Sequence, residues 1–179
     1  QVVVIDVDGD SAKQTAELIR AADGTAWSYK LDITDAQACS DLSKQIASEV
    51  GLIDVLVNNA GVLLRSPIDG PDAAQQWHTT LNVNVNGPFN MTQAFLPALK
   101  SQRGTIVNVA SIQSFVAAPT SASYATSKGA VVQFTRTLAA ELGPFGIRVN
   151  AIAPGIIETA MSADLRADPA KLASFLRHV

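Results

Sequence analysis

The chain has 179 residues, 47% of them apolar, and 13 basic against 16 acidic side chains give it a formal charge of −3. This length and apolar content predict one folded domain and exclude disorder. The acidic balance excludes a basic surface for nucleic acid or anionic membrane, and the aliphatic runs are too short to cross a bilayer. A single cysteine, Cys39, and two histidines, His78 and His178, form neither a disulfide nor a metal-ligand cluster, so we expect a cytoplasmic protein without a metal.

Short β-branched segments alternate with longer segments of helical spacing along the chain. The predicted strands span residues 2–5, 26–31, 53–57, 105–109 and 147–152. The predicted helical regions run from Asp10 or Ser11 to Gly24, from Thr34 to Gly51, from Leu81 to Phe95 and from Val131 to Leu142.

This alternation predicts an α/β fold with a doubly wound parallel sheet, because nearly continuous apolar strands are typical of sheets covered on both faces. No repeat or linker divides residues 1–179, so we expect one domain. In such sheets ligands bind beyond the carboxyl ends of the strands. The predicted strands end in Asp6, Asp32, Asn58-Asn59-Ala60-Gly61, Ala110-Ser111 and Ala153-Pro154-Gly155.

Acidic side chains follow the first two predicted strands. The carboxylate of Asp6 is placed to accept hydrogen bonds from the ribose hydroxyls of a dinucleotide and to repel a 2′-phosphate. Asp32 could meet an adenine amino group. Alternatively, Asp6 is a solvated loop acid and Asp32 a turn or capping residue.

Small and polar residues follow the later strands. Asn59, Ala60 and Gly61 would let the backbone approach a flat ligand, although the same tetrapeptide also forms ordinary turns. The hydroxyl group of Ser111 could donate to a carbonyl oxygen of a substrate or satisfy local backbone.

The segment SYATSK, residues 123–128, places Tyr124 and Lys128 four residues apart. On a helix these side chains share one face, and an ammonium ion beside a phenol favours the phenolate. Such a pair can serve as a proton donor and acceptor, or it can be an accidental surface pair.

Taken in order, these motifs resemble the short-chain dehydrogenase/reductase family over essentially the whole chain. The motifs are Asn58-Asn59-Ala60-Gly61, Asn82-Val83-Asn84-Val85-Asn86-Gly87, Ser111, Tyr124-Ala-Thr-Ser-Lys128, and Pro154-Gly155 with Thr159. The resemblance implies a Rossmann-like fold and hydride transfer between a nicotinamide cofactor and a secondary alcohol or ketone.

The resemblance also implies roles for individual residues. Tyr124 would be the general acid and base, Lys128 would assist it and bind the nicotinamide ribose, and Ser111 would polarise the substrate oxygen. Asn84 would hold a water that passes protons to Lys128, and the Ile157 backbone would fix the carboxamide together with the Thr159 hydroxyl. The implied cofactor contacts are Asp6, Asp32, Ile33, Asn59, Ala60, Gly61, Tyr124, Lys128, Pro154, Gly155, Ile157 and Thr159.

The acidic residues Asp6, Asp8 and Asp10 favour NAD over NADP. We expect a sugar, polyol or sugar acid as substrate, contacted by Ser111, Tyr124 and the amide of Gln113. Alternatively, Gln113 is a loop amide that faces water. One alternative is a 3-oxoacyl thioester reductase, which in this family usually goes with NADPH and with basic residues near the end of the strand that carries Asp6. Another is a non-catalytic dinucleotide-binding or scaffold protein. A serine hydrolase is disfavoured because no nucleophile elbow or histidine partner is visible.

Family members start with a further strand and a glycine-rich turn, and they continue past Val179. We therefore expect the sheet to be incomplete at both ends, with the missing strand between residues 2–5 and 53–57 and the substrate-covering segment 159–179 truncated. A homodimer or homotetramer is also implied, because the helices after Asn84 and Tyr124 pack against their copies in the family. The apolar residues counted as surplus on these helices are Phe89, Phe95, Phe134 and Leu138.

Overall fold

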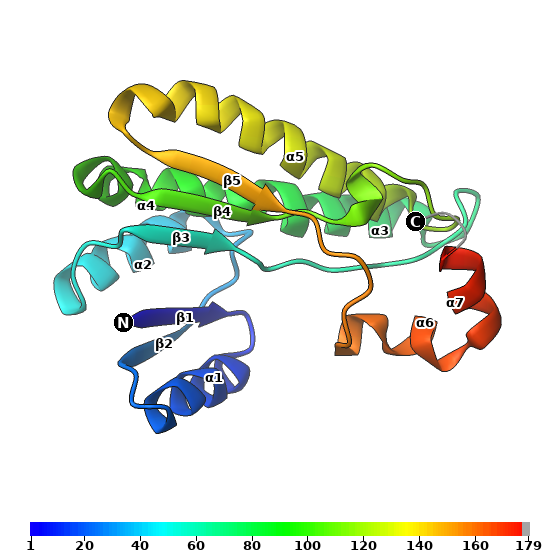
Figure 1. Ribbon diagram of the computed structural model, residues 1–179, viewed down its shortest axis with the longest axis horizontal. Helices are drawn as coiled ribbons and strands as arrows, with labels where there is room; N and C mark the ends of the chain where they lie inside the picture. Colours follow the sequence, from blue (N-terminus) through cyan, green and yellow to red (C-terminus); the bar gives the residue numbers. More distant parts are fainter. Residues whose placement is uncertain (177–179) are drawn as a thin grey trace.

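The computed structural model describes residues 1–176, and its strands form two separate parallel groups. In one group β1 (Val2–Asp6) pairs with β2 (Ala26–Lys30). In the other, β3 (Val55–Asn58), β4 (Thr105–Val109) and β5 (Arg148–Ile152) pair in that order. Figure 1 shows the two groups apart, with their arrows pointing toward the same end of the molecule. The predicted α/β fold with parallel strands is confirmed.

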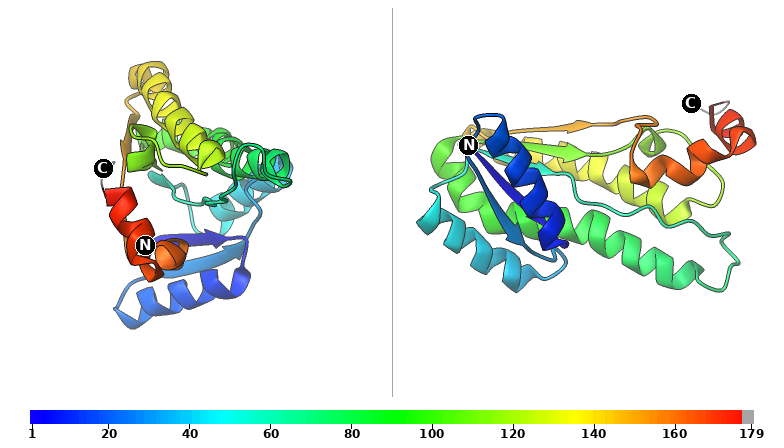
Figure 2. Two further views of the ribbon diagram at one scale, coloured as in Figure 1. Left: turned by 90° about the vertical axis from the view of Figure 1, so that its right-hand side faces the viewer. Right: turned by 90° about the horizontal axis from the view of Figure 1, so that it is seen from below.

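Some of the helices pack on these strands and others lie beside them. The helices are α1 (Gly9–Ala21), α2 (Ala36–Glu49), α3 (Ala73–Leu81), α4 (Gly87–Gln102), α5 (Ala122–Leu142), α6 (Ala163–Ala167) and α7 (Pro169–Leu176), and a π-helical turn (Asn82–Asn86) joins α3 to α4. Short 3₁₀ turns occupy Ile112–Ser114, Gly143–Phe145 and Ala160–Ser162. Helix α1 packs on β1 and β2, whereas α4 and α5 pack on the three-stranded group. Helices α6 and α7 lie beyond the carboxyl ends of the strands (Figures 1 and 2).

Two helices begin within two residues of the predicted starts, and capping explains the difference. Helix α1 begins at Gly9 because the carboxylate of Asp8 accepts a hydrogen bond from the backbone N–H of Asp10, at 3.1 Å. Helix α2 begins after Asp35, whose carboxylate accepts from the backbone N–H of Ala38 at 2.9 Å. In each case the carboxylate satisfies an N–H group that has no partner within the helix.

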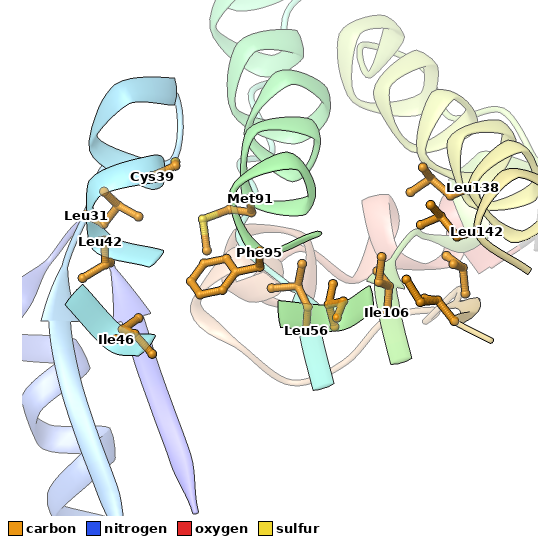
Figure 3. Packing of buried hydrophobic residues seen from close by; sticks show 13 residues of the cluster. Leu31, Cys39, Leu42, Ile46, Leu56, Met91, Phe95, Ile106, Leu138 and Leu142 are labelled. Atoms are coloured by element: carbon orange, nitrogen blue, oxygen red, sulfur yellow. The ribbon is translucent and has the colours of Figure 1, made fainter. Parts of the chain in front are cut away.

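The core lies between α2, α4, α5 and the three-stranded group. Figure 3 shows Met91 and Phe95 of α4 between the side chains of α2 and Leu56 of β3. The α5 side chains Leu138 and Leu142 point toward the same core. This packing places α4 and α5 against the strands whose ends carry the polar motifs.

The burial of the aromatic residues corrects one expectation. Phe95 and Leu138 are not surplus, because both are buried in the protein's own core. Phe89 is 50% exposed, and its ring lies 6.4 Å, centroid to centroid, from the ring of the partly buried Phe134. Only these two of the four predicted residues remain available for a contact between subunits.

A crevice of about 480 Å³ separates β1 from β3. Val3 and Ile5 line it from one side and Val55 and Val57 from the other. Within residues 1–176 no strand pairs with these facing edges of β1 and β3. The same stretch contains no helix of sufficient length and apolarity to span a membrane.

Candidate active site

A cavity of about 2040 Å³ opens at the carboxyl ends of the strands. The predicted site residues that line it are Asp6, Asp32, Ile33, Asn59, Ala60, Gly61, Ser111, Gln113, Tyr124, Lys128, Pro154, Gly155, Ile157 and Thr159. These residues are far apart in the sequence, but parallel strands bring their carboxyl ends to one edge of a sheet. Asn84 is the exception among the predicted site residues, since it is buried outside the cavity lining.

Tyr124 and Lys128 lie on one face of α5, as their spacing predicts. Helix α5 begins at Ala122, so Tyr124 falls in its first turn. The Nζ atom of Lys128 is 5.8 Å from the centroid of the Tyr124 ring. Both residues are at least nine-tenths buried, so their interaction is only weakly screened by water.

The ammonium group of Lys128 is held by the backbone and has no acidic partner. Its Nζ donates to the carbonyl oxygen of Val109 at 2.7 Å, and neither of the two ion pairs between described side chains includes it. Desolvation by burial lowers the pKa of Lys128 from 10.5 to about 8. The side chain is therefore a buried cation that could bind a ligand's hydroxyl groups.

Ser111 and Gln113 form the turn that follows β4. The hydroxyl oxygen of Ser111 accepts from the backbone N–H of Gln113 at 3.2 Å, and the Ser111 N–H donates to the hydroxyl of Ser114 at 3.3 Å. In the described part of the chain the hydroxyl hydrogen of Ser111 has no acceptor, and Oε1 of the buried Gln113 has no donor. The turn thus presents one donor and one acceptor that are not used locally.

The side chain of Asn84 is bonded to neighbouring protein groups. Its Oδ1 accepts from the backbone N–H of Val62 at 2.8 Å, and its Nδ2 donates to the Val62 carbonyl at 2.9 Å and to the Ser127 hydroxyl at 3.0 Å. Both amide hydrogens are used, and the side chain does not reach the cavity. The Asn84 side chain therefore positions the loop after β3 against α5, and the water predicted at Asn84 stays a prediction.

Gly61 leaves space beside Lys128. A Cβ atom at this position would lie 3.2 Å from Oδ1 of Asn84 and 3.5 Å from Nζ of Lys128. A side chain would fill the approach to the ammonium group, so glycine fits a ligand that binds there. Together with a cavity that extends from Asp6 to Thr159, this space fits an elongated dinucleotide.

The two acids at the other end of the cavity also hold turns. Oδ1 of Asp6 accepts from the backbone N–H of Asp8 at 2.9 Å, and Oδ1 of Asp32 accepts from the N–H and hydroxyl groups of Thr34 at 2.9 and 2.8 Å. In each carboxylate the second oxygen has no partner within residues 1–176, so it remains available to a ligand. The sequence analysis overlooked Lys30, which lies opposite Asp6 in the β1–β2 register.

Arg65 is a cavity residue that the sequence analysis also missed. It follows Gly61 in the loop after β3, and its Nη1 donates to the hydroxyl of Ser121 at 3.3 Å. The only signal in the sequence is a single cation close to the Asn-Asn-Ala-Gly motif. The sequence alone does not show that this cation lies in the cavity, because the loop meets the start of α5 only in the folded structure.

Parallel strands whose carboxyl ends surround a dinucleotide-sized cavity are the architecture of a Rossmann-like dinucleotide-binding fold, and the same cavity contains the buried Tyr124 and Lys128. The chain belongs to the short-chain dehydrogenase family, whose sequence profile matches residues 1–170.

Several characterised proteins are similar to the chain. It is 38% identical to the 3-oxoacyl-acyl-carrier-protein reductase of Thermotoga maritima, over 89% of this chain and 66% of that protein. It is 37% identical to the cyclopentanol dehydrogenase of a Comamonas species, over 92% of this chain and 66% of that protein. The crystal structure of a gluconate 5-dehydrogenase from Burkholderia cenocepacia, in complex with NADP and tartrate, matches with a TM-score of 0.87 at 35% identity, covering 94% of this chain and 66% of that one. The chain thus spans about two thirds of the length of these relatives.

Proposed function

We propose that the protein catalyses the reversible oxidation of a secondary alcohol to a ketone with NAD or NADP. The observation that carries this proposal is the buried pair of Tyr124 and Lys128 on one face of α5, in the same cavity as Ser111. The bound nicotinamide would supply the chemistry of accepting or giving hydride. The protein would supply proton transfer and orientation of the substrate.

Each polar group has a definite task in this proposal. The Tyr124 hydroxyl takes the proton from the alcohol oxygen on oxidation and returns it on reduction. The ammonium ion of Lys128 stabilises the phenolate, and it can exchange its bond to Val109 for ribose hydroxyls. The free hydroxyl hydrogen of Ser111 donates to the substrate oxygen and so holds it near Tyr124.

Gln113 supports a polyhydroxylated substrate. Its Oε1 is buried without a donor, and leaving a buried acceptor unpaired costs roughly 1–3 kcal/mol. A substrate hydroxyl beside the reacting carbon would satisfy it. We therefore propose a sugar, polyol or sugar acid, which agrees with the similarity to a gluconate 5-dehydrogenase.

A substrate panel tests the proposal. The full-length protein is incubated with polyols, sugar acids, cyclic alcohols and 3-oxoacyl thioesters, with NAD and NADP and their reduced forms, and the nicotinamide absorbance is followed. Tyr124→Phe should abolish turnover and leave dinucleotide binding nearly intact, because it removes the transferable proton and little volume. Near-normal turnover by Tyr124→Phe would contradict the mechanism. Dinucleotide binding without turnover of any substrate would favour the non-catalytic alternative.

A 3-oxoacyl thioester reductase is a second candidate. The 38% identity to the Thermotoga maritima reductase favours it, and the carboxylate of Asp6 disfavours the NADPH that this activity usually requires. Turnover of a 3-oxoacyl thioester with NADPH at a higher kcat/KM than any polyhydroxylated substrate would select this candidate.

We also propose a cytoplasmic protein that forms a homodimer or homotetramer through α4 and α5. Phe89 is half exposed beside Phe134, and neither side chain lines the cavity, so their apolar surface is available for a contact between subunits. Light scattering of the full-length protein at micromolar concentration should give at least the dimer mass. Phe89→Asp should shift the mass toward that of the monomer.

A further inference from the structure

Among the side chains that the structure describes, Arg65 is a cation in the candidate active site without an acidic partner. The two ion pairs between described side chains are Lys44–Asp41 and Arg166–Glu158, and Arg65 belongs to neither. Its one hydrogen bond is the 3.3 Å contact to the Ser121 hydroxyl. A guanidinium group has five N–H donors, so most of its binding capacity is unused.

The contact with Ser121 places Arg65 near the catalytic tyrosine. Ser121 is completely buried, immediately before α5, and three residues before Tyr124. Tyr124 lies in the first turn of α5, so the contact places Arg65 at the end of the helix that carries Tyr124. The loop that carries Arg65 is also fixed there, because the backbone N–H of Ser66 donates to the Thr120 carbonyl at 3.1 Å.

Charge is unevenly distributed around the cavity. The acidic lining residues, Asp6 and Asp32, lie at the ends of β1 and β2. Around α5 the charged lining residues are Lys128 and Arg65, which are both cations. This end of the cavity therefore favours a negatively charged group, and Lys128 is already assigned to the phenolate and the ribose.

We propose that Arg65 binds a carboxylate of the substrate, so that a sugar acid is a better substrate than the matched neutral polyol. A planar guanidinium and a planar carboxylate form two parallel hydrogen bonds, which fix orientation as well as affinity. Arg65 would hold the acid group while Gln113 accepts a hydroxyl, with the reacting carbon near Tyr124. This inference rests on the proposed function and specifies its substrate class.

The kinetic test compares an acid with its matched neutral polyol in the full-length protein. Values of kcat/KM are measured for gluconate and for glucitol. Arg65→Gln should lower kcat/KM for gluconate by roughly tenfold to hundredfold, which is typical of a lost charge-assisted hydrogen bond. The value of kcat/KM for glucitol should stay within about twofold of wild type. Arg65→Lys should give an intermediate loss, because lysine keeps the charge without the planar fork. Lys44→Gln is the control, since it removes one exposed positive charge outside the cavity.

A binding measurement separates this inference from the proposed function. Gluconate is titrated by calorimetry into the Tyr124→Phe protein saturated with cofactor, with and without Arg65→Gln. Binding that disappears with Arg65→Gln supports the carboxylate site, even if no alcohol or ketone is turned over and the proposed function fails. Absent or unchanged gluconate binding, or equal losses of kcat/KM for gluconate and glucitol, would overturn the role of Arg65 and leave the proposed oxidoreductase standing.

Discussion

Burial of the Lys128 ammonium group makes the stability of the protein depend on pH. The pKa of Lys128 is about 8 in the folded protein and near 10.5 when the chain is unfolded. Between these values the unfolded chain binds more protons, so the free energy of unfolding rises with pH. The full pKa difference between the two states corresponds to roughly 3 kcal/mol of the free energy of unfolding. Below pH 8 Lys128 is charged in both states, so the buried charge lowers stability by this whole amount.

Denaturant unfolding of cofactor-free wild type and Lys128→Met at pH 7, 9 and 10 measures this effect. The difference in free energy of unfolding should move in favour of wild type as the pH rises. Burial also raises the pKa of Cys39 to about 11, and a hydrogen bond to Glu49 raises that of Tyr29 to about 12. Both groups lower stability at high pH, but they are common to the two proteins and cancel. A pH-independent difference would show that Lys128 titrates normally.

The free carboxylate oxygen of Asp6 should set the cofactor preference. A 2′-phosphate beside it would be repelled, and Lys30 across the β1–β2 register offsets only part of this charge. We expect NAD to be preferred, and Asp6→Ala to lower the ratio of kcat/KM for NAD over NADP by roughly tenfold or more. Asp69→Ala, an acid outside the cavity lining, is the control. An unchanged ratio in Asp6→Ala would assign the preference to other residues.

Gly104 lies between the end of α4 and the start of β4, against the backbone of Asp54 just before β3. A Cβ atom there would lie 2.5 Å from the Asp54 carbonyl oxygen and 2.8 Å from Cδ2 of Leu99. Because the first of these atoms is backbone, the strands must shift. Gly104→Ala should lower the free energy of unfolding by roughly 1–3 kcal/mol in denaturant melts.

Gly129→Ala is the matched control for this prediction. A Cβ atom at Gly129, within α5, meets no atom within 4 Å. Alanine should raise stability there by up to about 1 kcal/mol, because glycine is a poor helix former. Equal effects of the two substitutions would contradict a steric origin.

At the scale of the whole molecule, the two groups of strands are joined weakly. The facing edges of β1 and β3 carry backbone groups without a partner strand, and Val55 and Val57 are about half exposed. Apolar surface that stays in contact with water loses roughly 25 cal/mol per Å² of the burial energy that stabilises a fold. We expect the 179-residue chain, expressed alone, to unfold without a sharp heat-capacity peak and to bind NAD too weakly to measure. A cooperative calorimetric transition together with micromolar NAD binding would contradict this expectation.

Local patterns in the sequence were sufficient to predict the α/β fold and the residues at the strand ends that line the cavity. Alternating strand and helix patterns are local properties of the chain, and parallel strands necessarily bring the residues at their carboxyl ends to one edge. The i,i+4 spacing of Tyr124 and Lys128 is equally local, so it predicted their shared face before any tertiary contact was known.

Only the tertiary structure decided which other side chains join the site. Arg65 meets Ser121 across 56 residues and Asn84 meets Ser127 across 43, and no periodicity in the sequence encodes such contacts. The same holds for Phe95, which is buried, and Phe89, which is half exposed, although both belong to α4. A helix pattern shows which residues share a face, but which faces are covered depends on the elements that pack against the helix.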